Sequence, residues 1–343
     1  MSEGSNLKEE IDQLRAEGDR AYEAGQWENA LSNYKAMTAL TITLNLKSVM
    51  AEGYRKCGHI ERMRGNFRAA EKMFQKALAV STSDADMPGI TDTLKGLSTL
   101  FFRKGEYGQA MRYGHEALSN ARTLKDPALL GSILIDVGNI YCVTGKYDEG
   151  MRSYEEALSI LPQKEFLQIG RTLNNIGETH KRFKRYNEAI ESLEKAITLG
   201  LDKGDPINRA WSLFCAAECY ARLGNTDKAL EYLDGAEPLL KEAADEVGLQ
   251  ELYKVRGVTL GFKGNFAGAK AFLEQAIKLG KKLMLPAETA SAYVELGIML
   301  KDQKDKEGAK GCFAQAQALY QGVRLEKELD EAKEHLEQLL NGT

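Results

Sequence analysis

The chain has 343 residues, of which 43% are hydrophobic and 28% are charged, and its formal net charge at pH 7 is -4. This near balance gives no reason to expect a nucleic-acid or membrane-surface partner, and no stretch approaches the ~18 continuous apolar residues of a membrane-spanning helix. The first ten residues are polar, unlike a secretory signal peptide, and the five cysteines are scattered, so we expect reduced thiols in a cytoplasmic protein.

Small residues recur along the chain at a pitch of 40 residues, with a single step of 39. The series contains seven alanines and one glycine: Ala30, Ala70, Ala110, Gly150, Ala189, Ala229, Ala269 and Ala309. A period this regular is typical of a stack of similar units rather than of a domain with one active-site cleft.

Each unit is predicted to contain two helices joined by a tight turn. An aromatic residue three positions before the small residue, a large residue four positions after it and a second small residue seven positions after it would share one helical face. Glycine commonly precedes the small residue by five positions, where it predicts a left-handed helix end. These glycines are Gly25, Gly65, Gly105, Gly145, Gly224 and Gly264.

Prolines mark the starts of several first helices. A proline in the first helical turn loses no hydrogen bond, and a preceding aspartate can cap the helix, as in Asp126-Pro127 and Asp205-Pro206. The four prolines predicted to lie at such starts are Pro88, Pro127, Pro206 and Pro286.

The repeating unit resembles the tetratricopeptide repeat. The stretch Val137-Gly138-Asn139-Ile140-Tyr141, followed by Gly145-Lys146-Tyr147, is similar to the Leu-Gly-x-x-Tyr and Gly-x-Tyr elements of that family. The longer pitch is similar to that of the Pins/LGN adaptor proteins and kinesin light chains. Ser98, Lys304 and Lys306 depart from the pattern, in the third and eighth units.

The resemblance implies an all-α fold, a right-handed α-solenoid superhelix of about eight helix-turn-helix units. We expect the solenoid to occupy residues 1–322, with the first unit starting near residue 8. Residues 323–343 are expected to form a C-terminal capping helix and a short tail, since apolar residues recur at helical spacing between Arg324 and Leu340.

The sequence offers little for catalysis or metal binding. It contains no Gly-x-Gly-x-x-Gly, no P-loop and no His-Glu-x-x-His. Cys215 and Cys219 could supply two ligands from one helix, but no second pair of suitable spacing follows, so buried small hydrophobic residues are favoured. We therefore expect no metal, no cofactor and no enzymatic activity.

A binding groove is implied by the resemblance, which places exposed groove positions on the first helix of each unit. Basic side chains outnumber acidic ones at these positions in units 2 to 5, opposite in sign to the whole chain. Asn139 and Asn175 occupy places where the Pins/LGN group holds peptide main chain. The predicted groove residues are Arg55, Lys56, His59, Arg62, Lys95, Arg103, Asn139, Arg171, Asn174, Asn175, Lys181 and Arg182.

These residues predict a non-catalytic scaffold or adaptor that holds an extended or helical acidic segment of a partner protein, with no nucleic acid and no membrane insertion. Arginine binds carboxylates bidentately, and asparagine can bond a peptide backbone. The candidate apolar anchors for the partner segment are Phe102, Trp211, Phe214 and Phe262. Trp211 and Phe214 can instead pack between units. The simpler interpretation is that the charges only solvate an exposed face.

Two other functional classes remain open. One is a peptide- or ligand-sensing regulator that changes its superhelical pitch on binding, by resemblance to the peptide-pheromone receptors of Gram-positive bacteria. The other is an enzyme, which a bound metal or cofactor would favour. The partner's identity and the oligomeric state are left open by the sequence.

Overall fold

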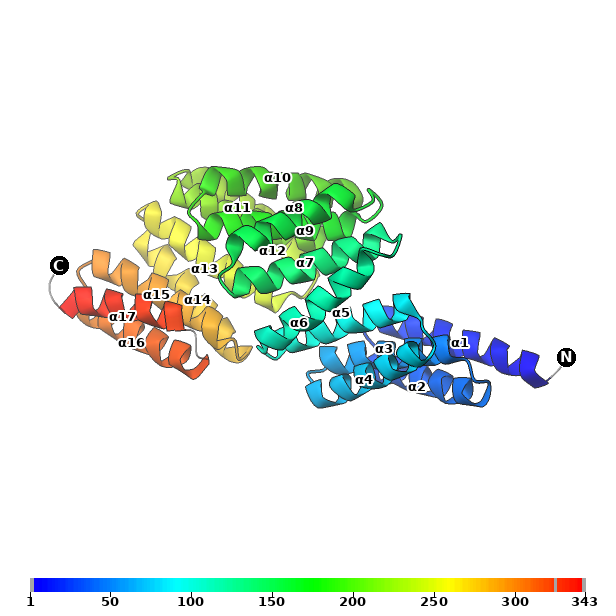
Figure 1. Cartoon of the computed structure of the whole chain (residues 1–343). Helices are drawn as coiled ribbons and strands as arrows, with labels where there is room; N and C mark the ends of the chain where they lie inside the picture. The colour runs from blue at the N-terminus through cyan, green and yellow to red at the C-terminus, as the bar shows by residue number, and fades with distance from the viewer. Residues whose placement is uncertain (1–2, 324–325, 341–343) are drawn as a thin grey trace. The chain divides into compact units, whose positions relative to one another are not determined.

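The computed structural model describes residues 3–323 and 326–340, and within these residues the chain forms seventeen α-helices and no strand (Figure 1). In each repeat a first helix, here called helix A, packs on a second, helix B. The predicted all-α solenoid of helix pairs is therefore confirmed. The chain divides after Glu165 into two compact units, and the single solenoid expected over residues 1–322 stays a prediction.

The N-terminal unit holds four helix pairs. They are α1 Glu3–Glu23, α2 Trp27–Thr43, α3 Lys47–Met63, α4 Phe67–Ser83, α5 Met87–Arg103, α6 Tyr107–Ala121, α7 Pro127–Val143 and α8 Tyr147–Ile160. The C-terminal unit holds four more pairs and a last helix. They are α9 Phe166–Arg182, α10 Tyr186–Lys203, α11 Pro206–Arg222, α12 Thr226–Glu242, α13 Glu246–Phe262, α14 Phe266–Lys282, α15 Pro286–Asp302, α16 Lys306–Val323 and α17 Glu326–Leu340.

The repeating small residues lie where helix B meets helix A. All seven alanines of the series are completely buried. Gly150 replaces alanine in the fourth repeat because a Cβ there would come within 2.4 Å of the Cys142 sulfur. The large residue four positions later is buried as well, as with Tyr34 and Phe74. The small residues thus let the paired helices approach, and the large ones fill the remaining space.

Glycines in helix A lie opposite those large side chains. A Cβ on Gly257 would lie 2.6 Å from the Cγ atom of Leu273, so no larger residue fits without displacing a neighbour. In the third repeat the two sizes are exchanged: Ser98 replaces the helix-A glycine, and Gly114 replaces the large helix-B residue. The Ser98 hydroxyl then donates a hydrogen bond of 2.8 Å to the Ala110 carbonyl oxygen.

The turn inside each repeat uses the left-handed backbone conformation. The six predicted glycines all have positive φ, as at Gly25 with 67°. In the fifth and eighth repeats Lys184 and Lys304 take the same conformation, with φ of 58° and 64°. A non-glycine residue there costs about 1–2 kcal/mol. The stack therefore imposes this turn geometry even where the sequence lacks the favoured residue.

Aspartate caps begin several helix-A segments. Asp126 and Asp205 cap α7 and α11 as predicted, each accepting a hydrogen bond from the backbone N–H three residues later. Asp86 and Asp245 cap α5 and α13 in the same way. All four prolines lie in the first turn of a helix, as predicted.

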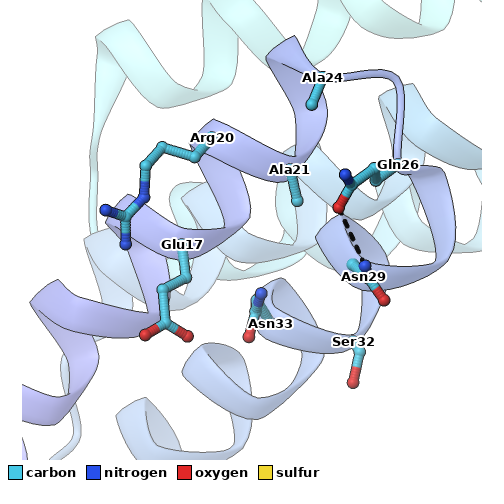
Figure 2. Close-up of a pocket in the computed structure, with 8 residues that line it drawn as sticks. All are labelled: Glu17, Arg20, Ala21, Ala24, Gln26, Asn29, Ser32 and Asn33. Carbon is cyan, nitrogen blue, oxygen red and sulfur yellow. Dashed lines mark hydrogen bonds between the residues drawn. The ribbon is translucent and has the colours of Figure 1, made fainter.

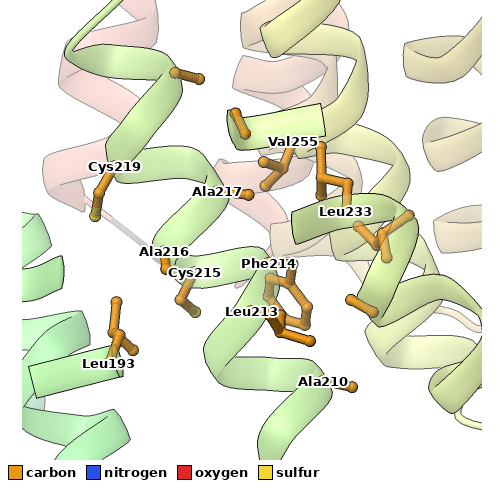
Figure 3. Packing of buried hydrophobic residues seen from close by; sticks show 14 of the residues in the cluster. Leu193, Ala210, Leu213, Phe214, Cys215, Ala216, Ala217, Cys219, Leu233 and Val255 are labelled. Atoms are coloured by element: carbon orange, nitrogen blue, oxygen red, sulfur yellow. The ribbon is translucent and has the colours of Figure 1, made fainter. Parts of the chain in front are cut away.

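The core of the C-terminal unit is built around α11. Leu213, Phe214 and Cys219 of this helix pack against Leu193 and Leu233 of the helices on either side (Figure 3). The α11 helix is in contact with α9, α10, α12 and α13, and most of its residues between Ala210 and Ala221 are buried. Both cysteines of this helix belong to that core, as the sequence favoured.

The last helix, α17, covers the end of the final pair. It packs on α16 and α15, with Ala332 completely buried and Leu339 nearly so. This packing fits the predicted capping role. The predicted first residues of the helix, 324–325, and the tail, 341–343, lie outside the described residues. Among the described helices, none combines the length and apolarity needed to cross a membrane.

Candidate functional site

Neighbouring helix-A segments are joined by side-chain pairs that are 37 residues apart. The Arg55 Nε atom lies 3.1 Å from a carboxylate oxygen of Asp92, and Lys181 Nζ lies 2.8 Å from a carboxylate oxygen of Glu218. The spacing follows from the fold. Equivalent positions of neighbouring repeats are 40 residues apart, and a separation shorter by about one helical turn brings two side chains to the same level. We call the faces carrying these side chains the N-terminal wall (α1, α3, α5, α7) and the C-terminal wall (α9, α11, α13, α15).

On the N-terminal wall, two of the predicted groove cations are already neutralised. Arg55 pairs with Asp92, as described above. The Lys56 ammonium contacts the Asp19 carboxylate, lies 3.8 Å from a carboxylate oxygen of Glu52 and is 5.0 Å from the centre of the Tyr34 ring. Counting charges along the sequence therefore overstates the free positive charge here, because the acidic partners come from neighbouring repeats.

His59 is held as a neutral ring on α3. It packs edge-on against Phe74 with 5.1 Å between ring centroids. Burial lowers the pKa of His59 to about 4, and the positive charges of Arg62 and Lys95 act in the same direction against the attraction of Asp92. His59 therefore contributes no charge to the wall near neutral pH.

Two arginines meet at a pocket on α3, α5 and α7. Arg62 and Arg103 make no ion pair within the described residues, and the buried Nε atom of Arg62 has no hydrogen-bond partner there. Burial and repulsion by Arg103 lower the pKa of Arg62. We call this cavity of about 210 Å³ the arginine pocket; it is lined by Arg62, Ser98, Thr99, Phe102, Arg103, Asp136, Asn139 and Ile140.

Asp136 lies against the arginine pocket without neutralising it. Burial raises the pKa of Asp136, opposed by the positive charge of Lys95, by a hydrogen bond from Thr99 and by Arg62. The Thr99 hydroxyl lies 3.4 Å from a carboxylate oxygen of Asp136. Lys95 has no ion pair within the described part of the chain. The Asp136 carboxyl group is therefore near Lys95 and Arg62, and Arg103 lines the same pocket, so the cations outnumber the acid and leave the pocket electropositive.

The remaining lining of the arginine pocket supplies apolar and amide contacts. Phe102, one of the predicted anchors, is partly exposed and lies 5.8 Å from Tyr107 between ring centroids. The side-chain oxygen of Asn139 accepts a hydrogen bond of 2.7 Å from the Tyr154 hydroxyl, which fixes the amide in place. The pocket thus combines cations, an aromatic surface and an oriented amide.

The C-terminal wall has the opposite character, because its charges are paired with one another. Lys181 lies between Glu178 and Glu218, and Lys254 lies 2.7 Å from Glu251. Burial opposes ionisation of Glu218, but Lys181 and Lys254 outweigh it and lower the pKa of Glu218 to about 2. Burial likewise opposes the charge on Lys181, yet the two glutamates raise its pKa well above the ordinary value.

The other predicted groove residues of this unit lie on α9. Arg171 is exposed, Asn174 and Asn175 are partly buried, and Arg182 lies 3.5 Å from Glu178. The structure therefore brings the predicted residues together as two sets, one on each wall. The N-terminal set consists of Arg55, Lys56, His59, Arg62, Lys95, Arg103 and Asn139. The C-terminal set consists of Arg171, Asn174, Asn175, Lys181 and Arg182.

Of the three predicted anchors in the C-terminal unit, two are structural. Phe214 is only 3% exposed, and the Trp211 indole N–H donates a hydrogen bond of 2.8 Å to Asp245. Packing between repeats, the alternative weighed from the sequence, accounts for both. Phe262 is half exposed and lies under the Arg222 guanidinium, 5.6 Å from the ring centre.

A pocket that the sequence did not indicate lies between α1 and α2, with a volume of about 480 Å³. Figure 2 shows Glu17 and Arg20 on α1 and Asn29, Ser32 and Asn33 on α2. Its lining is polar and of mixed charge, and none of the predicted groove residues belongs to it. Its one acidic and one basic side chain leave it no net charge, and no aromatic residue lines it.

Metal binding finds no support in the described residues, where no group of three or more potential ligands comes together. Burial raises the pKa of Cys219 to about 12 and also raises the pKa of Cys215. A thiol must lose its proton to bind a metal, so these two cysteines are poor ligands.

Comparison with known proteins agrees with the repeat architecture. Residues 129–202 match a family model described as tetratricopeptide repeat. The chain is 28% identical over 118 residues to "Outer dynein arm-docking complex subunit 4" of Xenopus laevis, a match that covers 34% of this chain and only 22% of that protein.

Solved structures share the fold along most of the chain. Aspartyl phosphate phosphatase F from Bacillus subtilis superposes with a TM-score of 0.69 at 15% identity, covering 94% of this chain and 95% of its own. A Rap protein complexed with Competence and Sporulation Factor gives a TM-score of 0.63 at 12% identity, covering 98% of both chains. At these identities the likeness concerns the fold alone. The repeat-family match over residues 129–202, the helix pairs and these solved structures together show that the chain has the tetratricopeptide-repeat fold.

Proposed function

We propose that the protein is a non-catalytic cytoplasmic adaptor that binds an acidic segment of a partner protein at the arginine pocket of the N-terminal wall. The family match and the shared fold support a protein-binding role. The observation that carries the finer proposal is the meeting of Arg62 and Arg103 at one pocket, with no ion pair within the described residues.

A carboxylate in this pocket would relieve two unfavourable features of the unbound protein. It would reduce the repulsion between Arg62 and Arg103, which already lowers the pKa of Arg62. It would also offer an acceptor to the buried Nε atom of Arg62. Hydrogen bonds to charged groups contribute about 1.5–3 kcal/mol, against about 0–1 kcal/mol for an exposed ion pair, so the buried arginine should dominate.

The two walls differ in what they offer a partner. On the C-terminal wall Lys181 and Lys254 already have carboxylate partners, and an acidic ligand would have to displace Glu218 or Glu251. On the N-terminal wall Lys95, Arg62 and Arg103 are unpaired within the described chain. We therefore place the acidic-segment site on the N-terminal wall and assign the charges of the C-terminal wall to stabilising the stack.

The proposal is tested by reversing the charge of the pocket. Binding of a fluorescein-labelled peptide made of repeated Glu-Ser-Leu-Glu units is measured by anisotropy for the wild type and for the Arg62→Glu/Arg103→Glu variant. We expect the variant to bind at least ~10-fold more weakly, which corresponds to about 1.4 kcal/mol.

The matched control is Arg68→Glu/Arg112→Glu, which makes the same change in net charge on helix-B segments α4 and α6. Both control arginines are exposed. The control variant should bind the peptide nearly as well as the wild type. Equal losses in the two variants, with unchanged circular dichroism, would show that only the overall charge matters and would refute the assignment to the pocket.

A further inference from the structure

A second cavity opens on the N-terminal wall beside the arginine pocket, between α1 and α3. It has a volume of about 420 Å³, twice that of the arginine pocket. We call it the tyrosine pocket; it is lined by Asp19, Tyr22, Glu23, Tyr34, Lys56 and His59. Apart from Lys56 and His59, none of these residues was indicated by the sequence.

The charge of the tyrosine pocket is opposite to that of its neighbour. Lys56 and Asp19 neutralise each other, and the Tyr34 hydroxyl adds a hydrogen bond of 2.5 Å to the same carboxylate. His59 is neutral, because burial lowers its pKa to about 4. The charge left over is that of Glu23, which is exposed and makes no ion pair within the described residues.

An aromatic ring, that of Tyr22, lines the same pocket as that carboxylate. Tyr22 is 38% exposed and is held edge-on against Trp27, with 5.4 Å between ring centroids. A pocket lined by an exposed ring and an unpaired carboxylate suits the long side chain of lysine or arginine, because the stem can pack on the ring while the charged end reaches the acid. A partner carboxylate would instead meet the negative charge of Glu23.

The two pockets adjoin along α3. His59 lines the tyrosine pocket, and Arg62, about one turn later, lines the arginine pocket. The Tyr22 phenol lies near enough to Arg62 to act on its pKa, opposing the effect of burial. Neighbouring packed helices lie about 8–10 Å apart, which an extended peptide spans with roughly three residues.

We infer that the partner segment is bipolar, with a lysine or arginine in the tyrosine pocket and an acidic residue in the arginine pocket, roughly two to four residues apart. This inference rests on the proposed function and narrows it. A segment of uniform negative charge would fill only one of the two pockets. In the bound segment the basic residue would lie towards α1 and the acidic residue towards α5 and α7.

The experiment is a selection of random peptides displayed on phage against the immobilised full chain, followed by sequencing. The wild type should enrich peptides in which a basic residue stands roughly two to four positions from an acidic one. The Glu23→Lys variant should lose enrichment of the basic residue at least ~5-fold while keeping that of the acidic residue. Glu10→Lys, the same change at an exposed position on α1, should select as the wild type does.

The outcomes separate this inference from the proposed function. Enrichment of acidic residues alone, or an unchanged basic preference in Glu23→Lys, would overturn the bipolar ligand and leave the acidic-segment site standing. If the wild type and Arg62→Glu/Arg103→Glu enrich the same peptides, both are overturned. A Glu23→Gln variant, which keeps the size of the side chain, should show the same loss and confirm that charge is responsible.

Discussion

Arg62 and Lys56 lie within two turns of one helix, yet only one of them has a charged partner. Lys56 contacts Asp19 of α1, whereas Arg62 faces Arg103 and the buried Asp136. The sequence predicts both as groove cations, because each stands at a groove position of its repeat. Which one is neutralised depends on the residue 37 positions away and on its rotamer, and a single repeat does not contain that information.

His59 gives a prediction at the same scale. Its pKa is lowered from 6.5 to about 4 by burial, with Arg62, Lys95 and Arg55 acting in the same direction and Asp92 opposing them. As the pH falls below 6.5, His59 therefore binds a proton in the unfolded chain but stays neutral in the folded chain until about pH 4. The stability of the N-terminal unit should be fully present above pH 6.5 and fall as the pH drops towards 4.

The His59 prediction is checked by NMR titration of the histidine ring signals together with urea unfolding at pH 7 and pH 5. We expect the His59 signals to shift with a midpoint near pH 4 and the unfolding midpoint to be lower at pH 5. A ring that titrates near pH 6.5 would contradict the burial on which the neutral state depends.

At the scale of the helix pair, the close approach of helix A to helix B rests on glycine. A side chain on Gly257 would meet Leu273 at 2.6 Å and the backbone oxygen of Ala269 at 3.0 Å, and backbone cannot move aside cheaply. We expect Gly257→Leu to lower the free energy of unfolding by about 1–3 kcal/mol through overpacking.

The control for Gly257→Leu is Gly311→Leu, on α16 of the same unit. A Cβ on Gly311 meets nothing within 4 Å, and leucine has the higher helix propensity. Thermal unfolding followed by circular dichroism should show a lower midpoint for the first variant and an unchanged or higher midpoint for the second. Equal midpoints would contradict the packing of α13 on α14 described above.

The helix pairs are also the scale at which the sequence is most informative. The buried alanines, the left-handed glycines and the capping aspartates each depend only on residues within one repeat. The sequence pattern of a repeat therefore predicts them. The sequence shows Gly150 as the one exception in the alanine series, but the reason for the glycine is the sulfur of Cys142 on the other helix of the pair. Lys184 and Lys304 take the left-handed conformation because the surrounding packing requires it, which local propensity does not reveal.

For the whole molecule, the sequence predicts one basic groove, and the structure shows two walls of different character. Lys181 and Lys254 of the C-terminal wall are held by glutamates, whereas Arg62 and Arg103 of the N-terminal wall are not. Repeats 2 to 5 contain helices of both walls, so the sum of their charges does not distinguish the two walls. Glu23, the acidic side of the N-terminal wall, lies in the first repeat, whose charges do not enter that sum.

The central claim is that the free positive charge of the arginine pocket selects an acidic segment. It is tested most directly by comparing two peptides, one of Glu-Ser-Leu-Glu units and one of Lys-Ser-Leu-Lys units, on the wild type and on Arg62→Glu/Arg103→Glu. We predict that the wild type prefers the acidic peptide and that the variant prefers the basic one. The same preference in both proteins, whichever peptide it favours, would contradict the account.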